Sequence, residues 1–327
     1  MGGENHFDNK TAYAKQEEVY FDDGRETELI RGILGSSDCE KMRGSPRKVL
    51  AAIDAFGRQK YLMNIGQEKG AIVTKLIATH KPKVMVRIPF TPCAVPGVVS
   101  CLPAFAVSSS NFMISISINA KKTRQPVVQV ELGGYVGYSA ILFADAVRAA
   151  GGKHFYCLEH NPEFFSIVRM LCELAGLGDF VTVIYGDSAE CLRQLKSQGL
   201  FTQIDLLFLD HYKPLYLRDL KLCEELGFIN LGTTLVADNV IKPGNPPYLA
   251  YVRATPEEKK KMAASADESR SADGGGSAEN ETSVEEDPKG NPSLIYESSL
   301  VESFEPTGIP DGVEISRCVG LLSDDMS

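Results

Sequence analysis

Two apolar runs of the chain end in side chains of the kind that bind hard metal ions. Asp210 follows the run 206–209, and Asp238 and Asn239 follow the run 235–237. In an open parallel sheet, ligands bind beyond the carboxyl ends of the strands, so we expect these three side chains to share one crevice. Three oxygen ligands leave positions for water and substrate, which suits Mg²⁺. The sequence therefore predicts a magnesium site at Asp210, Asp238 and Asn239.

Lys213 lies three residues after Asp210, close enough to sit beside a hydroxyl bound to such a metal. A divalent cation lowers the pKa of a neighbouring lysine and of a bound hydroxyl, which makes Lys213 a candidate general base near neutral pH. An exposed loop lysine is the alternative and, by frequency, the commoner one. Neither His160 nor His211 has a spaced partner typical of zinc.

A glycine-rich turn, Glu131-Leu-Gly-Gly-Tyr-Val-Gly137, stands between an apolar run and an amphipathic stretch. Such a turn lets backbone N–H groups approach a ligand, and a helix N-terminus favours an anion. The pattern is not the GxGxxG of dinucleotide enzymes, and a plain tight turn is an equal alternative. Glu159 ends the next apolar run, about 20 residues on, where a nucleotide-binding sheet places its ribose-binding acid. A solvated glutamate is the alternative there.

The elements that must position these residues alternate along the chain, which predicts a doubly wound α/β sheet, mostly parallel, with helices on both faces. The expected strands cover residues 127–132, 154–158, 181–185, 204–209 and 234–237. The expected helices between them cover residues 139–150, 162–175, 188–198 and 214–226. Upstream, residues 26–34, 46–56 and 69–80 have helical apolar spacing and predict an N-terminal helical layer.

We expect a single domain over residues 26–322 with disordered additions. Residues 1–25 are polar and predict a disordered N-terminus. Residues 256–292 are rich in Gly, Ser and acidic residues and nearly free of large apolar groups, so a disordered insert is expected before a last ordered piece, 293–322.

Residues 87–130 form an anomalous insert, since Ile88 to Ala120 carries no charge and contains four prolines. A membrane helix is disfavoured by those prolines. If Val86 to Gln129 is removed, the rest reads KPKVM-VELGGYVGYSA, an uninterrupted strand and turn. Because valine codons begin GT and a glutamine codon can end AG, our hypothesis is a retained intron, and transcript sequencing tests it. If the insert is translated, residues 127–130 can replace 84–86 as the first strand.

The formal charge of −9 argues against a nucleic-acid partner, because neutralising phosphates needs clustered Lys and Arg. The eight cysteines are scattered without CxxC pairs, so we expect reduced thiols and a cytoplasmic location. The first twenty residues hold no apolar stretch typical of a secretory signal. We therefore expect a small-molecule partner, no membrane association and a monomer.

With these motifs in place, the chain resembles the catechol O-methyltransferases over about residues 26–86 and 131–253, and more weakly over 293–305. Four segments carry the likeness: Tyr61-Leu-Met-Asn-Ile-Gly66, Glu131 to Ala140, Phe208-Leu-Asp-His-Tyr-Lys213 and Ala237-Asp-Asn-Val-Ile-Lys-Pro-Gly244. The resemblance implies the fold of the S-adenosylmethionine-dependent methyltransferases, with Mg²⁺ held by Asp210, Asp238 and Asn239.

The resemblance also implies roles for further residues. Lys213 would take the catechol proton, and Glu302 would accept from the second catechol hydroxyl. The positions similar to those that hold S-adenosylmethionine are Met63, Asn64, Gly66, Glu131, Gly133, Tyr135, Ser139, Glu159, His160, Ser188, Asp210 and His211.

The chain departs from this family in having no Trp, so its aromatic gate would be Tyr61 and Tyr212. Ala189 stands where the animal enzymes have Gln, and His160 where they have Met. These changes leave the substrate preference open. The expected reaction is Mg²⁺-dependent methyl transfer from S-adenosylmethionine to a catechol. A related cation-dependent phenolic O-methyltransferase is one alternative, and a non-catalytic binding protein with a disrupted first strand is another; the glycine pattern disfavours a nicotinamide dehydrogenase.

Overall fold

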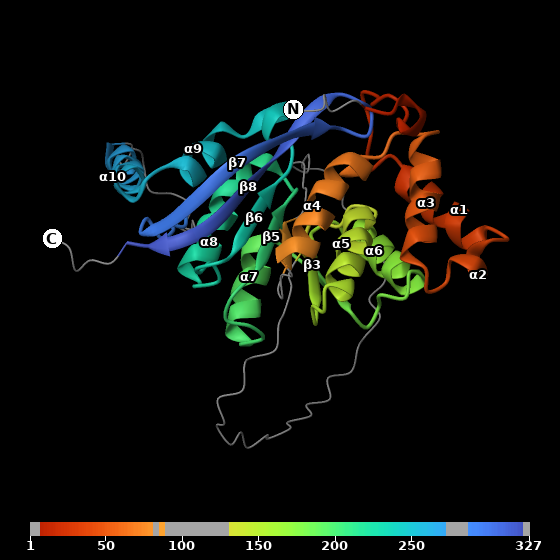
Figure 1. The fold of residues 1–327 in the computed structure, drawn as a ribbon, viewed down its shortest axis with the longest axis horizontal. Coiled ribbons are helices and arrows are strands. Elements are labelled where there is room, and N and C mark those ends of the chain that lie inside the picture. The colour runs from red at the N-terminus through yellow and green to blue at the C-terminus, as the bar shows by residue number, and fades with distance from the viewer. Residues whose placement is uncertain (1–6, 81–84, 89–130, 273–286, 323–327) are drawn as a thin grey trace, which may run out of the picture.

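The computed structural model describes residues 7–80, 85–88, 131–272 and 287–322. Its described strands form one sheet with helices on both faces (Figure 1). The strands are β1 (Met85–Ile88), β2 (Glu131–Leu132), β3 (Phe155–Glu159), β4 (Val181–Tyr185), β5 (Leu206–Leu209), β6 (Thr234–Ala237), β7 (Leu294–Phe304) and β8 (Pro310–Leu321). Across the sheet they run β4, β3, β1 with β2, β5, β6, β8, β7. The pairings of β8 with β6 and β7 are antiparallel and the other described pairings are parallel, which confirms the predicted doubly wound, mostly parallel sheet.

Two strands share one place in the sheet, because β1 and β2 both lie between β3 and β5. Arg87 and Glu131 both pair with Cys157. The strand that leads into the glycine turn is therefore built from both sides of the anomalous insert. The expectation that residues 127–130 would supply this strand lies outside the described residues, and the structure places residues 85–88 there.

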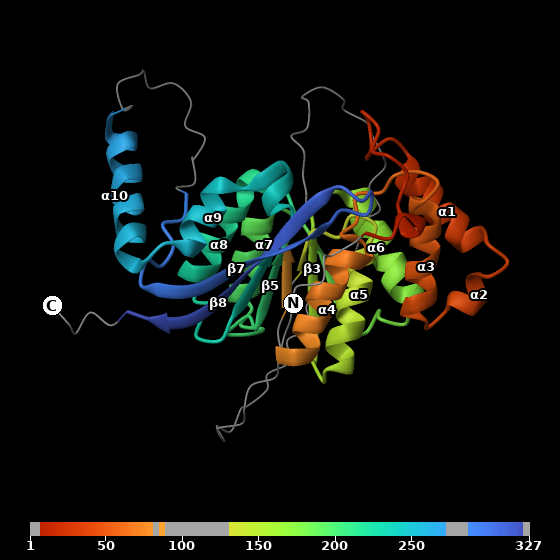
Figure 2. The ribbon, with the colours of Figure 1, turned by 45° about the horizontal axis from the view of Figure 1, so that its top comes forward.

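Alternate side chains of the central strands enter two separate cores, as expected for strands buried on both faces. On β5, Leu206 and Phe208 join one core, and Leu207 and Leu209 join the other. The helices that contribute to the first core are α1 (Arg25–Gly35), α2 (Cys39–Met42), α3 (Pro46–Gly57), α4 (Gly66–His80), α5 (Tyr138–Ala149) and α6 (Pro162–Leu174). Those of the second core are α7 (Ser188–Ser197), α8 (Tyr216–Glu225) and α9 (Pro246–Arg253), behind the sheet in Figure 2.

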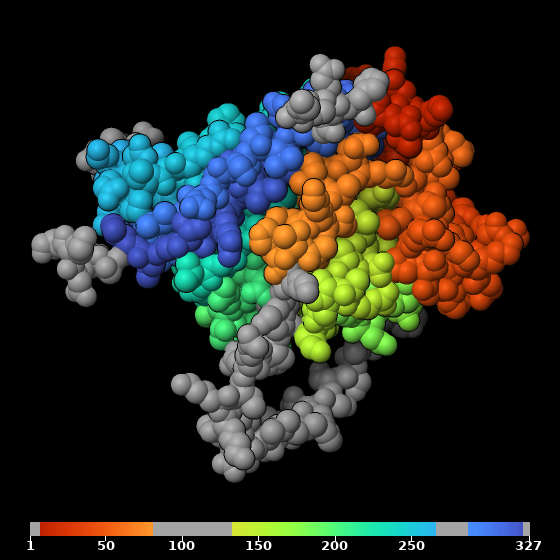
Figure 3. Space-filling view, in the orientation of Figure 1, coloured from red at the N-terminus to blue at the C-terminus, as the bar shows by residue number. Residues whose placement is uncertain are grey.

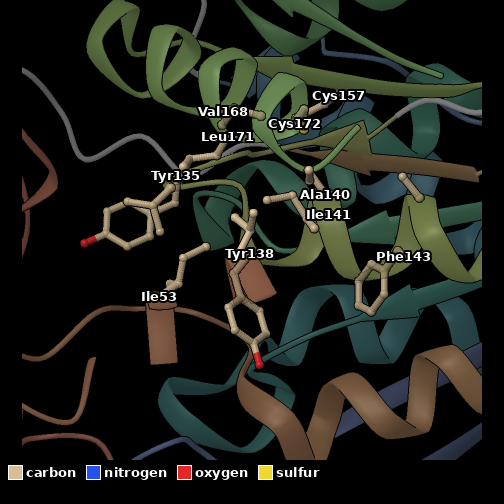
Figure 4. Close-up of a cluster of buried hydrophobic side chains, with 14 of the residues drawn as sticks. Ile53, Tyr135, Tyr138, Ala140, Ile141, Phe143, Cys157, Val168, Leu171 and Cys172 are labelled. Carbon is tan, nitrogen blue, oxygen red and sulfur yellow. The ribbon is translucent and has the colours of Figure 1, made fainter. Parts of the chain in front are cut away.

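The glycine turn between β2 and α5 packs directly on α6. Gly134 lies against the Val168 side chain, so that any larger residue at 134 would collide with it. Gly137 and Tyr135 have φ of 80° and 43°, in the left-handed region that glycine adopts most readily. Figure 4 shows Tyr135 and Tyr138 leaving this turn with their hydroxyl groups pointing apart. Close packing therefore fixes the path of the turn.

The structure corrects the expected disorder at the N-terminus. Residues 7–24, called the N-terminal segment below, are described and packed against the domain (Figure 3). Phe7 and Tyr13 are buried, and a short 3₁₀ helix, η1 (Asn9–Thr11), lies between them. The prediction of disorder rested on the polar composition of this segment and overlooked these two aromatic side chains. Each of them buries enough surface to order a short segment.

The structure also differs from the expected disordered insert, because its first part forms α10 (Pro256–Ala272). Thr255 and Glu258 form a capping box: the Thr255 N–H donates to Glu258 Oε2 at 2.8 Å, and the Glu258 N–H donates to Thr255 Oγ1 at 3.3 Å. Lys259 is buried over two tyrosine rings and donates to the Leu294 carbonyl at 2.8 Å. Residues 273–286 of the insert lie outside the described part of the chain.

No disulfide joins any two of the six described cysteines. In the same part of the chain, no helix is both long enough and apolar enough to cross a membrane.

Candidate active site

A cavity of about 320 Å³ lies at the carboxyl ends of the parallel strands. Gly133 follows β2, Glu159 ends β3, Asp210 follows β5 and Asp238 follows β6. Its lining residues are Gln16, Tyr20, Tyr61, Met63, Asn64, Gly133, Tyr135, Glu159, Phe164, Asp210, Lys213, Asp238, Asn239, Lys242, Pro243, Glu305, Thr307 and Ile309. Both the position and the size are typical of a small-molecule site in an α/β sheet.

One end of the cavity is formed by the glycine turn and Glu159. The buried Glu159 carboxylate accepts from the backbone N–H groups of Gly134 at 2.8 Å and Tyr135 at 3.1 Å. Its other oxygen accepts from the Asn161 N–H at 2.8 Å, and the Asn161 side chain in turn caps the first turn of α6. The predicted ribose-binding acid is thus fixed at the turn and faces the cavity.

The same end receives residues from the N-terminal helical layer. Met63 and Asn64 line the cavity, as the resemblance implied. The Tyr135 hydroxyl donates to Glu26 Oε1 at 2.8 Å, which joins the glycine turn to α1. Burial raises the pKa of Tyr135 well above its usual value, and the Glu26 carboxylate adds to the rise. Tyr135 is therefore a neutral donor that holds the turn in place.

Two predicted cofactor residues, His211 and Ser188, lie behind the cavity wall in a buried network. His211 Nε2 is 3.1 Å from Asp219 Oδ2, and Ser188 Oγ donates to the same oxygen at 2.5 Å. Arg218 Nε donates to the other Asp219 oxygen at 2.7 Å. Burial lowers the pKa of His211 to about 4, so its ring is neutral at pH 7.

The other end of the cavity is acidic and contains the three predicted metal ligands, Asp210, Asp238 and Asn239. Asp238 is buried, and its Oδ1 accepts from the Asn239 N–H at 2.8 Å. Burial raises the pKa of Asp238 to about 6, and the nearby Asp210 carboxylate contributes to the rise although Lys69 opposes it. Asn239 has a left-handed backbone with φ of 57°, which asparagine tolerates better than most residues.

Lys69, on α4, is a fully buried cation at the centre of this acidic end. Its Nζ lies 2.7 Å from Asp238 Oδ1, 2.7 Å from Glu305 Oε1 and 2.9 Å from Asp311 Oδ2. Burial alone would lower the pKa of Lys69, but the three carboxylates hold it well above its usual value. Lys69 therefore remains charged and fixes one oxygen of Asp238.

Asp311, on β8, orients the turn that carries Asn239. Its Oδ2 accepts from Asn239 Nδ2 at 3.0 Å, and its Oδ1 accepts from the backbone N–H groups of Ile241 at 3.2 Å and Lys242 at 2.9 Å. Asn239 Nδ2 also donates to Glu305 Oε1 at 2.5 Å. Since the amide nitrogen of Asn239 is engaged by two carboxylates, its oxygen is the atom left for the cavity.

The predicted base Lys213 begins a short 3₁₀ helix, η2 (Lys213–Leu215), and lines the cavity. Its Nζ donates to the Tyr216 hydroxyl at 2.8 Å and lies 3.5 Å from Asp210 Oδ1. The Lys213 amino group is thus held beside the predicted metal ligands, where a bound hydroxyl would be placed.

The structure puts Glu302 elsewhere than the resemblance implied. Glu302 is exposed on β7, paired with Gly312, and is not among the residues that line the cavity. Glu305 lines it instead, and burial raises the pKa of Glu305 to about 8 while Lys69 opposes the rise. The two glutamates are three residues apart at the end of a hairpin strand, so a loose alignment could not choose between them.

The remaining predicted site residues differ in how they stand to the cavity. Gly66 begins α4 with φ of 73° and lies against the Pro306 ring, and Ser139 is buried at the start of α5. His160 is exposed after β3, and the side chain of Glu131 is outside the described part. Tyr61 lines the cavity as predicted for the gate, whereas Tyr212 does not.

Sequence reasoning missed Lys69, which carried a signal nonetheless. Lys69, Val73 and Ile77 recur on the buried face of α4, so the helical period itself placed a charged residue in the core. A buried lysine needs carboxylate partners, and these come from distant strands. Tyr20, Glu305 and Asp311 had no comparable signal.

The oxygen-rich end fits a divalent cation of the Mg²⁺ type. Asp210, Asp238 and Asn239 offer two carboxylates and one amide, all oxygen donors. Within the described residues, no three His, Cys, Asp or Glu side chains group as a metal site, so the amide of Asn239 is needed to complete the set. Burial raises the pKa of Asp238, and repulsion from Asp210 and Asp311 adds to the rise; a bound cation would relieve that repulsion.

The chain is similar in sequence to known methyltransferases. A family model described as "Methyltransferase domain" matches residues 130–240. The catechol O-methyltransferase of Bos taurus is 34% identical over 211 residues, which cover 64% of this chain and 61% of the bovine protein. That of Sus scrofa is 42% identical over 130 residues, which cover 40% of this chain and 69% of the pig protein.

The chain belongs to the catechol O-methyltransferase family. It spans about 61% of the bovine and 63% of the Mus musculus members of this family. Among solved structures, the O-methyltransferase from Bacillus cereus in complex with SAH has a TM-score of 0.45 at 15% identity, covering 90% of this chain and 96% of that chain. Family membership rests on the sequence matches, and the strand order of the sheet defines the fold.

Proposed function

We propose that the protein transfers the methyl group of S-adenosylmethionine to a hydroxyl of a catechol with the help of Mg²⁺. The observation that supports this proposal best is that one cavity contains both ends of such a reaction. Gly133 and Glu159 line one end, and Asp210, Asp238 and Lys213 line the other. A methyl donor and a metal-bound acceptor could therefore meet without a large movement of the fold.

In this proposal the chain's residues mainly bind and orient. Glu159 and the backbone of the glycine turn bind the cofactor, together with Met63 and Asn64. Asp210, Asp238 and Asn239 would hold Mg²⁺, which when bound supplies positive charge that favours the ionised catechol oxygen. Lys213 Nζ takes the catechol proton, and Glu305, rather than Glu302, hydrogen-bonds the second hydroxyl.

The test is methyl transfer from labelled S-adenosylmethionine to a simple catechol, with Mg²⁺ and with chelator, on the full chain. We expect activity that chelator abolishes. Asp238→Ala should lower turnover by about 100-fold or more, because a metal ligand and a buried partner of Lys69 are lost together. Asp145→Ala, a change on the exposed face of α5, is the control and should leave turnover unchanged.

Three other results would each contradict a different part of this proposal. Undiminished turnover in Asp238→Ala would refute the metal site. A preference for a monophenol or a larger phenylpropanoid ester over catechol would support the related phenolic O-methyltransferase. Calorimetric binding of S-adenosylmethionine without any turnover would leave a non-catalytic binding protein.

A further inference from the structure

The N-terminal segment contributes side chains to the cavity. Gln16 and Tyr20 line it, although they precede the first helix of the domain. The Tyr20 ring lies edge-on to Tyr61, with centroids 5.8 Å apart and an interplanar angle of 70°. It also meets the Phe21 ring at 5.1 Å. Tyr20 therefore forms an aromatic wall with Tyr61.

Tyr13 anchors this segment from one side. Its hydroxyl donates to the buried Asp54 carboxylate at 2.7 Å, and its N–H donates to the Pro306 carbonyl at 2.8 Å. The next N–H, of Ala14, donates to the Gly57 carbonyl at 2.9 Å. Figure 1 and Figure 2 both place the segment, in red, beside the tip of the β7–β8 hairpin, in blue. The segment is thus fixed to the hairpin that carries Glu305.

Arg25 anchors the segment from the other side. The buried guanidinium pairs with Glu17 at 2.6 Å and donates to the carbonyls of Val19 at 2.9 Å and Tyr61 at 2.7 Å. Tyr20 is therefore held between two fixed points, next to the backbone of Tyr61. Such a position is not that of a loose terminus that happens to touch the cavity.

Tyr20 and Tyr61 line the cavity together with Glu305. Burial raises the pKa of Tyr61, and the Glu305 carboxylate adds to the rise. Thr307 and Ile309, from the hairpin tip to which the segment is fixed, line the cavity as well. The wall therefore borders the same cavity as Glu305 and the hairpin tip.

We propose that Tyr20 is a substrate-contacting residue, and that the aromatic ring of the methyl acceptor packs against the wall made by Tyr20 and Tyr61. This inference rests on the proposed function only for the identity of the acceptor as a catechol. Aromatic rings in offset or edge-on contact stabilise each other beyond the area they bury. Tyr20 thus makes the N-terminal segment part of the substrate site and not only of the fold.

The kinetic test compares Tyr20→Ala with Val19→Ala, the control, whose side chain is 63% exposed on the same segment. Tyr20→Ala should raise the KM for catechol about 3- to 10-fold, as loss of one aromatic contact predicts, with the KM for S-adenosylmethionine unchanged. Tyr20→Phe should keep the wild-type KM. An equal rise of both KM values, or none, would overturn the proposal. Thermal unfolding of each variant checks that the fold is intact.

A second readout does not depend on turnover. The chain contains no Trp, so Tyr20→Trp introduces a single tryptophan at the wall, and its fluorescence reports on that position. Catechol added in the absence of S-adenosylmethionine should quench or shift this emission, while Val19→Trp should not respond. A response in Tyr20→Trp without methyl transfer would refute the proposed function and keep the wall as a catechol-binding surface. No response in a protein that methylates catechol would refute the wall alone.

Discussion

Lys69 is the residue whose surroundings differ most from those typical of its type. It is fully buried, and three carboxylates from two distant parts of the chain surround its Nζ. Removing one charged member of such a buried cluster lowers the free energy of unfolding, because the remaining charges are left unpaired in an interior that solvates them poorly. Lys69 therefore links the stability of the fold to the shape of the acidic end of the cavity.

At the residue scale, Lys69→Met should lower the free energy of unfolding at pH 8 by about 3–5 kcal/mol. The deficit should shrink at pH 5. Lys69 lowers the pKa of Asp238, Glu305 and Asp311, so without it these carboxyls have higher pKa values in the folded state and bind protons there. Lowering the pH then favours the folded variant over its unfolded state.

Urea denaturation of metal-free protein at both pH values measures this effect. Lys75→Met, an exposed change on the same helix, serves as the control and should cost little at either pH. A deficit of equal size at pH 8 and pH 5 would contradict the charge argument and leave lost packing as the cause.

At the element scale, α10 shows how a local signal can outweigh composition. Its polar composition alone predicts disorder. The segment Thr255-Pro-Glu-Glu258 nonetheless provides a capping box and Pro at the first helical position. The Lys259 ammonium then lies over the rings of Tyr251 and Tyr296 in cation–π contacts. Whether this segment forms a helix is therefore decided by where the capping residues and Lys259 stand along it, not by its number of apolar residues.

Thr255→Ala should therefore destabilise α10 by about 1 kcal/mol, the usual cost of losing an N-cap side chain. Faster amide hydrogen exchange over residues 256–265, with little change in α4, is the expected signature. Thr79→Ala, an exposed threonine within α4 that caps nothing, is the matched control. Unchanged exchange in α10 would mean that the docking of Lys259 alone holds the helix.

At the scale of the whole molecule, the shared register of β1 and β2 bears on the anomalous insert. Val86 pairs with Tyr156 and Glu131 with Cys157, the next residue along β3. Removing residues 86–129 joins Met85 to Val130, so that Val130 would take the place of Val86 and Glu131 would follow in register. The shortened chain would thus restore one continuous strand without a slip.

We therefore expect the variant lacking residues 86–129 to fold, to unfold at a higher temperature than the full chain, and to keep catechol methylation. A variant lacking residues 86–130 is the control. In this control Glu131 would follow Met85 directly and take the position of Val86. Every later side chain of the strand would then point to the opposite face of the sheet, so both stability and activity should be lost. Calorimetry and the labelled-methyl assay measure the two properties, and equal behaviour of the two deletions would contradict the register argument.

The sequence by itself determined the sheet, the strand-end positions of Glu159, Asp210 and Asp238, and the place of Lys213. These follow from local patterns, since an apolar run ended by an acid specifies both a strand and the edge at which its acid emerges. The bounds of β4 and β6 were predicted to the residue for the same reason. The family membership rested on the same motifs and was confirmed by the comparisons.

Only the tertiary structure decided which residues from distant segments complete the cavity. Tyr20, Glu305 and Asp311 lie in stretches whose local sequence pattern gives no sign of which residues they contact. The contacts that the N-terminal segment and α4 make with the β7–β8 hairpin join positions more than 200 residues apart, as Lys69 and Glu305 are. A polar side chain reads as solvated until packing buries it. The aromatic and hairpin side of the cavity is therefore a property of the fold, whereas the places of the proposed metal ligands Asp210, Asp238 and Asn239 could be predicted from the chain.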